Sequence, residues 1–326
     1  MFLKGQHLIN GSSPSEFLLL QFSRVHELQI LCFFGFLAFY LAAVVGNLLI
    51  ISAVASDHHL KTPMYFFLMN LAILDLGQVS VIFPRTMANS LMNCRHISYF
   101  GCVTQVLFFV FFMTSDFSLL TVMAYDRYVA ICNPLQYEML MSKQSCIRMT
   151  TLVWITSFLN GVLHTGGTFS SPFCSNVVNQ FFCEIPALLK LACSDLYLIE
   201  IGALSLCAVI ALGCCIFIVV TYVHIFAAVL RIPSVQGRQK AFSTCLPHLI
   251  VFSLFSFTAY FAYLNPTSNS VSHLDLAFSM IYSMVPPLMN PVVYSMRNKE
   301  IRHALSKLLG LRSCTTNVFS NPVLQE

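Results

Sequence analysis

Charged side chains are scarce in this sequence: Asp, Glu, Lys and Arg together make up 9% of its 326 residues. A soluble domain carries about 25%, because ionised groups keep its folded surface in water. Tryptophan is nearly absent too, with one residue against 30 Phe, while apolar residues reach 57%. The composition therefore excludes an ordinary soluble domain and predicts a chain surrounded mostly by lipid.

Other functional signals are missing as well. The basic residues form no aromatic-interleaved cluster, so the net charge of +4 does not indicate nucleic-acid binding. No metal-ligand set or nucleophile and base stand at catalytic spacing, which argues against an enzyme. Many transporters are built from internal repeats, and no internal repeat is visible in this sequence. The N-terminus also lacks the basic start and apolar core of a cleavable signal peptide, so the first spanning helix is expected to direct insertion.

Long apolar stretches take the place of charge. A helix of about 20 mainly apolar residues crosses the hydrocarbon core of a bilayer. We predict an all-α membrane protein: a seven-transmembrane helix bundle over residues 28–296, preceded by an N-terminal segment (1–27) and followed by a cytoplasmic piece (297–326). The seven spans are Leu28–Ala55, Met64–Ile82, Val103–Ala124, Met149–Gly166, Ile199–Val229, Phe242–Leu264 and Leu274–Tyr294.

The basic residues predict the orientation. Seven spans put the termini on opposite sides, and Lys and Arg gather on the cytoplasmic side. With the N-terminus outside, the cytoplasmic loops and tail hold 12 of the 17 Lys and Arg. The triplet Asn10-Gly11-Ser12 agrees, since this acceptor can be glycosylated only on the luminal side. We expect a multi-pass plasma-membrane protein with an extracellular, glycosylated N-terminus.

The C-terminal piece predicts a short amphipathic helix. Ile301, Leu305, Leu308 and Leu309 recur at helical spacing on one face, with basic residues opposite. Such a helix lies flat on the inner leaflet of the membrane.

Four cysteines indicate disulfide chemistry on the outer side. Cys102 opens the third span, and Cys174, Cys183 and Cys193 lie in the long loop after the fourth. Four thiols in an oxidising compartment allow three connectivities. A bridge from the loop to Cys102 would fold the loop over the bundle as a lid. Cys94 is a fifth outer cysteine, which this scheme leaves unpaired.

The third span ends in Asp126-Arg127-Tyr128, 25 residues after Cys102. At 1.5 Å per residue this distance is about 37 Å, enough to cross the membrane. Cys102 is therefore expected outside and Arg127 inside. The three residues fit either a solvated helix end with a local ion pair or a functional switch.

Two carboxylates lie within spans, Asp75 in the second and Asp116 in the third. Ionisable residues inside a membrane are costly and therefore candidates for function. Asp116 is 11 residues from Arg127, close to three helical turns, so both should face the bundle interior. If the carboxylates meet, either a sodium ion or a shared proton must relieve their repulsion. Further oxygen ligands are available at Asn47, Ser115 and Asn290.

Prolines mark the seventh span at Pro286-Pro287 and Asn290-Pro291. Each proline deletes a backbone hydrogen bond and is expected to interrupt the helix with a bend. Such a bend can serve helix movement or packing alone.

Together these motifs resemble the odorant receptors, a branch of the rhodopsin-like G-protein-coupled receptors, from about Phe17 to Leu309. The residues that carry the resemblance are Gly46-Asn47, Pro63-Met64-Tyr65-Phe66-Phe67-Leu68, Leu71 to Asp75, Met123 to Cys132, Lys240 to Cys245 with His248, and Pro286 to Ser295.

The resemblance implies roles for several of these residues. It implies bridges from Cys102 to Cys183 and from Cys174 to Cys193. It implies that Asp126-Arg127-Tyr128 is the switch that exposes Arg127 to the G protein on activation. In the active state its partners would be Tyr222 and Tyr294. It further implies a heterotrimeric G protein of the stimulatory olfactory type, cyclic AMP as the signal, and olfactory cilia as the location.

The resemblance also implies a ligand pocket in the outer half of the bundle. Its residues would be Phe109, Val110, Met113, Thr114, Leu206, Ile210, Ala259, Tyr260 and Tyr263. Such a lining is apolar with a few hydroxyl groups, which suits a small, weakly polar volatile ligand. Val110, Met113 and Thr114 are equally what a packing face at helical spacing would show. Phe109 stands where amine receptors place an acid, which argues against cationic amines.

Two departures from the family pattern concern the sixth span. Phe255-Ser256-Phe257 replaces a Phe-Tyr-Gly run, and Pro247 precedes His248 where a serine is usual. Both put in question how ligand contact reaches the switch. A rhodopsin-like receptor for a non-odorant small molecule is the alternative interpretation. A transporter is a weaker one, since two intramembrane carboxylates are too few to line a path.

Overall fold

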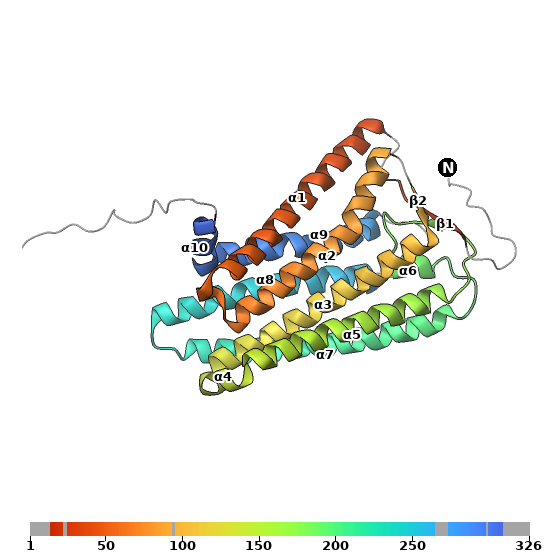
Figure 1. Cartoon of the computed structure of the whole chain (residues 1–326). Helices are drawn as coiled ribbons and strands as arrows, with labels where there is room; N and C mark the ends of the chain where they lie inside the picture. Colours follow the sequence, from red (N-terminus) through yellow and green to blue (C-terminus); the bar gives the residue numbers. More distant parts are fainter. Residues whose placement is uncertain (1–13, 22–24, 93–94, 265–272, 298, 309–326) are drawn as a thin grey trace, which may run out of the picture.

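The computed structural model describes residues 14–21, 25–92, 95–264, 273–297 and 299–308. Long helices lie side by side along most of the molecule (Figure 1). Each of the seven predicted spans falls within one of them, so the predicted helix bundle is confirmed. The seven helices are α1 (His26–Ser56), α2 (Pro63–Met92), α3 (Tyr99–Cys132), α5 (Lys143–Phe169), α7 (Tyr197–Leu230), α8 (Val235–Leu264) and α9 (His273–Arg297).

Helices α1, α2, α3, α5 and α7 are each long and apolar enough, in the part of the chain that the structure describes, to cross a membrane. In α8 the apolar stretch is shorter, Cys245–Tyr260. α8 packs against α3 and α9, and α9 packs against α1 and α2. These two helices therefore complete the same bundle.

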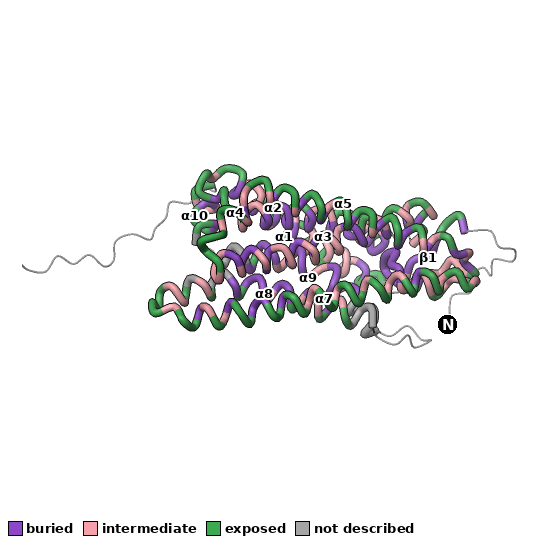
Figure 2. Tube along the Cα trace, turned by 90° about the horizontal axis from the view of Figure 1, so that it is seen from below, coloured by how far each residue is buried: buried purple, intermediate pink, exposed green. Residues whose placement is uncertain are grey.

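The outer surface of the bundle is apolar. Leu31 on α1 is 67% exposed, and Val209 and Val223 on α7 are 66% and 61% exposed. Figure 2 shows exposed residues around the outside of the helices and buried ones along their inner sides. Leaving so many large apolar side chains exposed is stable when hydrocarbon, not water, surrounds them.

Three short strands close one end of the bundle, which we call the sheet end. They are β1 (Glu16–Leu19), β2 (His96–Ser98) and β3 (Val177–Val178), in the order β2-β1-β3. β1 pairs antiparallel with β2 and parallel with β3. Phe17 on β1 is fully buried against the rings of Phe169 and Phe173. The sequence did not predict these strands, because two to four residues carry too little periodicity.

The opposite end of the bundle carries the short helices α4 (Tyr137–Leu140) and α10 (Lys299–Leu308) (Figure 1). α10 is the predicted amphipathic helix: Ile301 and Ala304 are buried, while Arg302 and His303 are exposed. The Tyr65 hydroxyl of α2 donates to the Glu300 carboxylate over 2.6 Å. Leu309 lies outside the described residues.

The prolines of α9 delete hydrogen bonds as expected, yet α9 is one continuous helix. A proline cannot donate to the carbonyl four residues earlier, so Pro287 frees Ser283 O and Pro291 frees Pro287 O. Gln78 Nε2 donates to Ser283 O over 3.1 Å, and Asn47 Nδ2 donates to Pro287 O over 2.9 Å. The expected interruption is therefore absent, and α1 and α2 supply donors to two of the three carbonyls that the prolines of α9 leave open.

Replacing Gln78 with leucine tests this exchange. The variant Gln78→Leu should unfold more easily, by about 1–3 kcal/mol, because Ser283 O would be left buried without a donor. Thermal or denaturant unfolding of the purified protein in detergent measures the change.

The matched control restores the donor. In the double variant Gln78→Leu, Pro287→Ala, the alanine amide can donate to Ser283 O. The stability lost on Gln78→Leu should therefore be smaller when residue 287 is alanine than when it is proline. If the two substitutions changed the free energy of unfolding additively, Gln78 would not be replacing the donor that Pro287 lacks.

Candidate functional site

The loop between α5 and α7 lies across the sheet end and is held by two disulfides. Cys102 at the start of α3 is bonded to Cys183, and Cys174 is bonded to Cys193. Of the three connectivities, the pairing that the resemblance implied is thus confirmed. Cys94 lies outside the described residues. We call the loop between the two helices (residues 170–196) the lid.

The underside of the lid packs on α3. Gln105 Oε1 accepts from the Cys183 amide over 2.9 Å, while its Nε2 donates to Val81 O of α2 over 3.1 Å. The ring of Phe182 packs on that of Phe109, with centroids 5.5 Å apart. One glutamine therefore ties the lid, α2 and α3 together directly beside the disulfide.

A buried carboxylate fastens the lid to α9. Glu184 is 5% exposed and accepts hydrogen bonds from the Tyr282 hydroxyl at 2.7 Å and the Ser279 hydroxyl at 3.0 Å. The sequence interpretation missed this contact. An acid directly after Cys183 was the available signal, but its partners lie about 95 residues later in the chain.

The predicted pocket residues do not all face the interior. Phe109 and Val110 on α3 are buried, Met113 and Ala259 are half-buried, and Thr114 accepts from Asn160 Nδ2 at 3.2 Å. Three others lie instead on outer faces: Leu206 and Ile210 of α7 and Tyr260 of α8 are 62%, 59% and 59% exposed. The side chain of Tyr263 lies outside the described residues.

The face of α7 explains this difference. Its buried residues recur as Glu200, Ile218, Thr221, Tyr222 and Ile225, with Cys207 half-buried on the same stripe. At about 100° per residue, Ile210 stands about 80° and Leu206 about 120° from the middle of this stripe. α7 is apolar on every side, so its sequence contains little information about which face turns inward.

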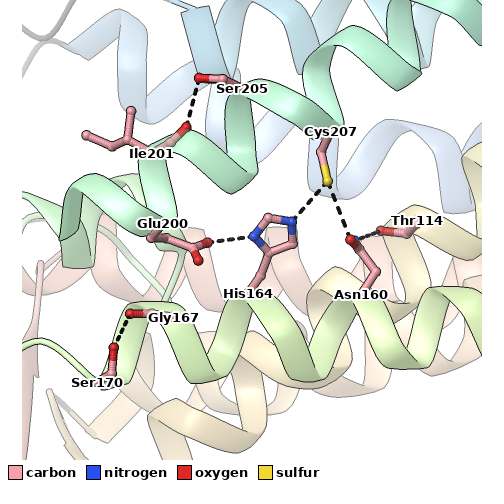
Figure 3. A network of polar contacts seen from close by, with 9 residues as sticks. All are labelled: Thr114, Asn160, His164, Gly167, Ser170, Glu200, Ile201, Ser205 and Cys207. Atoms are coloured by element: carbon pink, nitrogen blue, oxygen red, sulfur yellow. Dashed lines mark hydrogen bonds and ion pairs between the residues drawn. The ribbon is translucent and has the colours of Figure 1, made fainter. Parts of the chain in front are cut away.

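Polar groups join α5 to α7 inside the bundle (Figure 3). His164 Nδ1 and Glu200 Oε1 are 2.6 Å apart, and both side chains are almost fully buried. His164 Nε2 lies 3.2 Å from Cys207 Sγ, which is 3.5 Å from Asn160 Oδ1. A side chain in place of Gly167 would collide with the Glu200 carboxylate.

The Cys207 thiol donates its one hydrogen to Asn160 Oδ1, so in the contact with His164 Nε2 the sulfur is the acceptor. The chain of contacts ends at Thr114, a predicted pocket residue on α3. The four members of the network on α5 and α7 were not predicted, because each is a single polar residue in an apolar helix: Asn160, His164, Glu200 and Cys207.

The two membrane carboxylates lie in the core of the bundle. Asp75 and Asp116 are 0% and 1% exposed, and their charges lie close enough to interact. Asn290 Nδ2 donates to Asp75 Oδ2 over 2.8 Å. Both Asp116 oxygens, Asp75 Oδ1 and Ser115 Oγ have no hydrogen-bond partner among the described groups. Buried oxygens without donors favour a proton or a cation between them.

At the opposite end of α3, Asp126 and Arg127 are both buried, 1% and 8% exposed. Asp126 Oδ1 accepts from the Tyr137 hydroxyl of α4 over 2.9 Å. Burial, and then the nearby Asp126 carboxylate, raise the pKa of Tyr137 above its usual range. Tyr137 therefore stays protonated and remains a donor, and burial excludes the solvated helix end.

The residues around Arg127 connect three helices. The Tyr222 hydroxyl of α7 lies 2.9 Å from His248 Nδ1 of α8, and His248 Nε2 lies 2.8 Å from Leu120 O of α3. The Tyr128 ring packs edge-on against His224, with centroids 6.3 Å apart. The side chain of Tyr294 lies outside the described residues. In this arrangement the Tyr222 hydroxyl is hydrogen bonded to His248.

The departures in the sixth span leave α8 intact. Pro247 lies inside the continuous helix. Phe255 is buried and its ring lies 5.9 Å from that of Phe117 on α3. Aromatic packing thus links α8 to α3 at this level.

The fold is a seven-helix bundle of the rhodopsin type. The chain matches squid rhodopsin with a TM-score of 0.69 and 17% identity, over 91% of this chain and 90% of that one. The family model described as olfactory receptor matches residues 36–312. Human olfactory receptors 14I1 and 14A2 are each 47% identical to the chain, over 92% and 93% of its length and 96% of theirs.

The chain therefore belongs to the olfactory receptor family, which confirms the resemblance seen in its motifs. It is a multi-pass membrane receptor rather than an enzyme, and as a member of this family it binds a small molecule and couples to a G protein.

Removing the disulfide between α3 and the lid should block folding of the sheet end. Cys183→Ser leaves Cys102 unpaired, and loss of a native disulfide typically costs about 2–5 kcal/mol. We expect the variant to be absent from the cell surface when live, unpermeabilised cells are stained.

Cys214→Ser is the matched control, because Cys214 is free and half-buried on α7. It should reach the surface normally. Normal surface staining of Cys183→Ser would contradict a structural role for the bridge.

Proposed function

We propose that this receptor binds small, weakly polar volatile odorants beneath the lid and activates a stimulatory olfactory G protein, which raises cyclic AMP. The observation that carries the proposal is the course of α3. One helix holds the lid at Cys102 and the buried Arg127 at its other end, a span of about 37 Å.

The orientation proposed is N-terminus outside. The sheet end with its disulfides then lies in the oxidising extracellular space, and α10 with its exposed Arg302 and Lys307 lies on the inner leaflet. The positive excess of the cytoplasmic segments supports this orientation. Glycosylation at Asn10 and residence in olfactory cilia belong to the same proposal.

The ligand class follows from what surrounds the site under the lid. Phe109 packs against Phe182 of the lid and Tyr282 of α9, and Met113 and Leu276 belong to the same buried cluster. Apolar and aromatic side chains of this kind bind a ligand mainly through shape and desolvation. Glu184, the buried acid nearby, is already hydrogen bonded to two hydroxyl groups. A neutral ligand therefore fits better than a cationic amine.

The signal is proposed to pass along α3 and α7 to the cytoplasmic end. At rest, Tyr137 holds Asp126, and Tyr222 is held by His248. Activation would release Tyr222 from His248 and bring it, together with Tyr294, to Arg127. The arginine would then be available to the G protein.

Arg127→Ala tests the switch. The variant should reach the cell surface at normal levels yet give no cyclic AMP response to odorants that activate the parent receptor. A cyclic AMP assay over a chemically broad odorant panel, with surface expression measured in parallel, provides the comparison.

Arg148→Ala is the matched control, since Arg148 is exposed at the start of α5 at the same end of the bundle. Its response should equal that of the parent receptor. A full response from Arg127→Ala would refute the switch.

We further propose that a sodium ion occupies the space at Asp75 and Asp116. Hard cations bind oxygen ligands, and Asp116 presents two buried oxygens without donors. Asn290 contributes by orienting Asp75 and offers its own Oδ1, which has no partner among the described groups. The ion would offset the repulsion between the two carboxylates.

The sodium dependence of stability separates the ion from a shared proton. Purified receptor should melt at higher temperature in sodium chloride than in choline chloride at equal ionic strength, and Asp116→Asn should abolish the difference. Equal melting of the parent receptor in both salts would show that a proton, not sodium, relieves the repulsion.

A further inference from the structure

A cavity lies at the sheet end, and none of the predicted odorant-pocket residues lines it. It measures about 410 Å³ and is formed by α2, β2 and the first turns of α3. Val81 and Ile97 give it apolar walls, while Arg85 and Ser98 give it polar ones. Its volume falls within the roughly 300–1,000 Å³ of small-molecule sites. We call it the Arg85 cleft.

The guanidinium of Arg85 is the unusual feature of this cleft. Its Nε is buried and has no hydrogen-bond partner among the described groups. A guanidinium carries five N–H donors and cannot lose its charge in a protein. Arg85 is half-buried and lines the cleft, so an anion bound there would meet a guanidinium that keeps its charge.

The rest of the cleft is also electropositive. α3 begins here, with Ser98 as its N-cap and Gly101 in its first turn, and a helix N-terminus carries partial positive charge. None of the residues that line the cleft is acidic. Glu16, an acid on the neighbouring strand β1, lies 3.3 Å from His96 and is engaged there.

The other polar groups of the cleft leave few donors besides Arg85. Both ends of the Gln105 amide are bound, to Val81 O and to the Cys183 amide, and Thr104 Oγ1 donates to Phe100 O. Ser98 Oγ accepts from the Gly101 amide over 3.1 Å, so its own hydroxyl hydrogen can be donated to a ligand. Arg85 and Ser98 are therefore the two groups positioned to bind an anion.

The position of Arg85 along α2 favours an amphiphile. Seven residues, about 10 Å, separate it from the end of a 30-residue helix of about 45 Å. The hydrocarbon core is about 30 Å thick, which puts Arg85 near the boundary between hydrocarbon and headgroups. A ligand here meets charge at one end and apolar surface at the other.

We propose that the Arg85 cleft binds a small anionic amphiphile, a carboxylate with a short hydrocarbon chain, at a site separate from the odorant site. The carboxylate accepts from Arg85 and Ser98, and the chain lies against Val81 and Ile97. Gln105 borders this cleft and also holds the Cys183 amide. An occupant therefore contacts a residue that fastens the lid.

Octanoate is the probe. The full-length receptor is placed in nanodiscs of neutral phosphatidylcholine and titrated with radiolabelled octanoate. Binding should be saturable, Arg85→Gln should weaken it about tenfold or more, and Arg85→Lys should retain most of it. Octanol, which lacks the charge, should not displace octanoate from the parent receptor.

Arg95→Gln is the matched control, because Arg95 lies at the same end of the bundle but does not line the cleft. Its affinity should be unchanged. Val81→Phe fills the cleft without touching the charge and should also abolish binding, which keeps the test open if Arg85→Gln fails to fold. Equal octanoate affinity in the parent receptor and Arg85→Gln would overturn the proposal.

A lipid headgroup offers the same chemistry, and a second arm separates the two sources. Nanodiscs containing phosphatidylglycerol are compared with neutral ones by the melting temperature of the receptor. One pair of results would identify a lipid headgroup as the occupant: octanoate binding that does not saturate, and phosphatidylglycerol that stabilises the parent receptor but not Arg85→Gln. The carboxylate proposal would then be wrong.

Discussion

A hydrocarbon environment offers no hydrogen bonds, so a polar group in the bundle depends on another part of the chain, or on a bound ion, for a partner. Gln78 and Asn47 meet this demand by donating to the carbonyls that Pro287 and Pro291 leave open. His248 meets it by joining Tyr222 to a carbonyl of α3. The polar contacts that satisfy the backbone are therefore the same contacts that fix the order and spacing of the helices.

α3 is the element on which these contacts converge. It packs against α2, α5, α7 and α8, and it bears the lid disulfide at one end and buried Arg127 at the other. Of the side chains between them, Gln105 bonds α2 and the lid, and Asp116 faces Asp75. A movement of this helix changes contacts at both ends at once, as a receptor requires.

The sequence predicted the features that depend on periodicity and composition. It predicted little about which distant residues contact one another. Long apolar stretches located all seven helices, and the spacing of Asp116 and Arg127 correctly turned both inward. The inward face of α7 was not predictable, because its apolar residues surround the whole helix, and Leu206 and Ile210 are exposed instead. The partners of Glu184 were also hidden, because distant contacts leave no local pattern. The disulfide pairing came from family resemblance, since spacing alone allowed three connectivities.

The packing of α7 suggests why its few polar contacts matter. It is the most apolar of the five membrane-length helices among the described residues, yet only 6% of its most apolar stretch is buried. Lipid surrounds hydrocarbon side chains as well as protein does, so apolar contacts hold α7 to the bundle only weakly. Glu200 near one end and Tyr222 nearer the other are both buried, and they are hydrogen bonded to His164 and His248. Since both belong to one helix, a ligand that disturbed the network at Cys207 would, under the proposed function, also act on the contact between Tyr222 and His248.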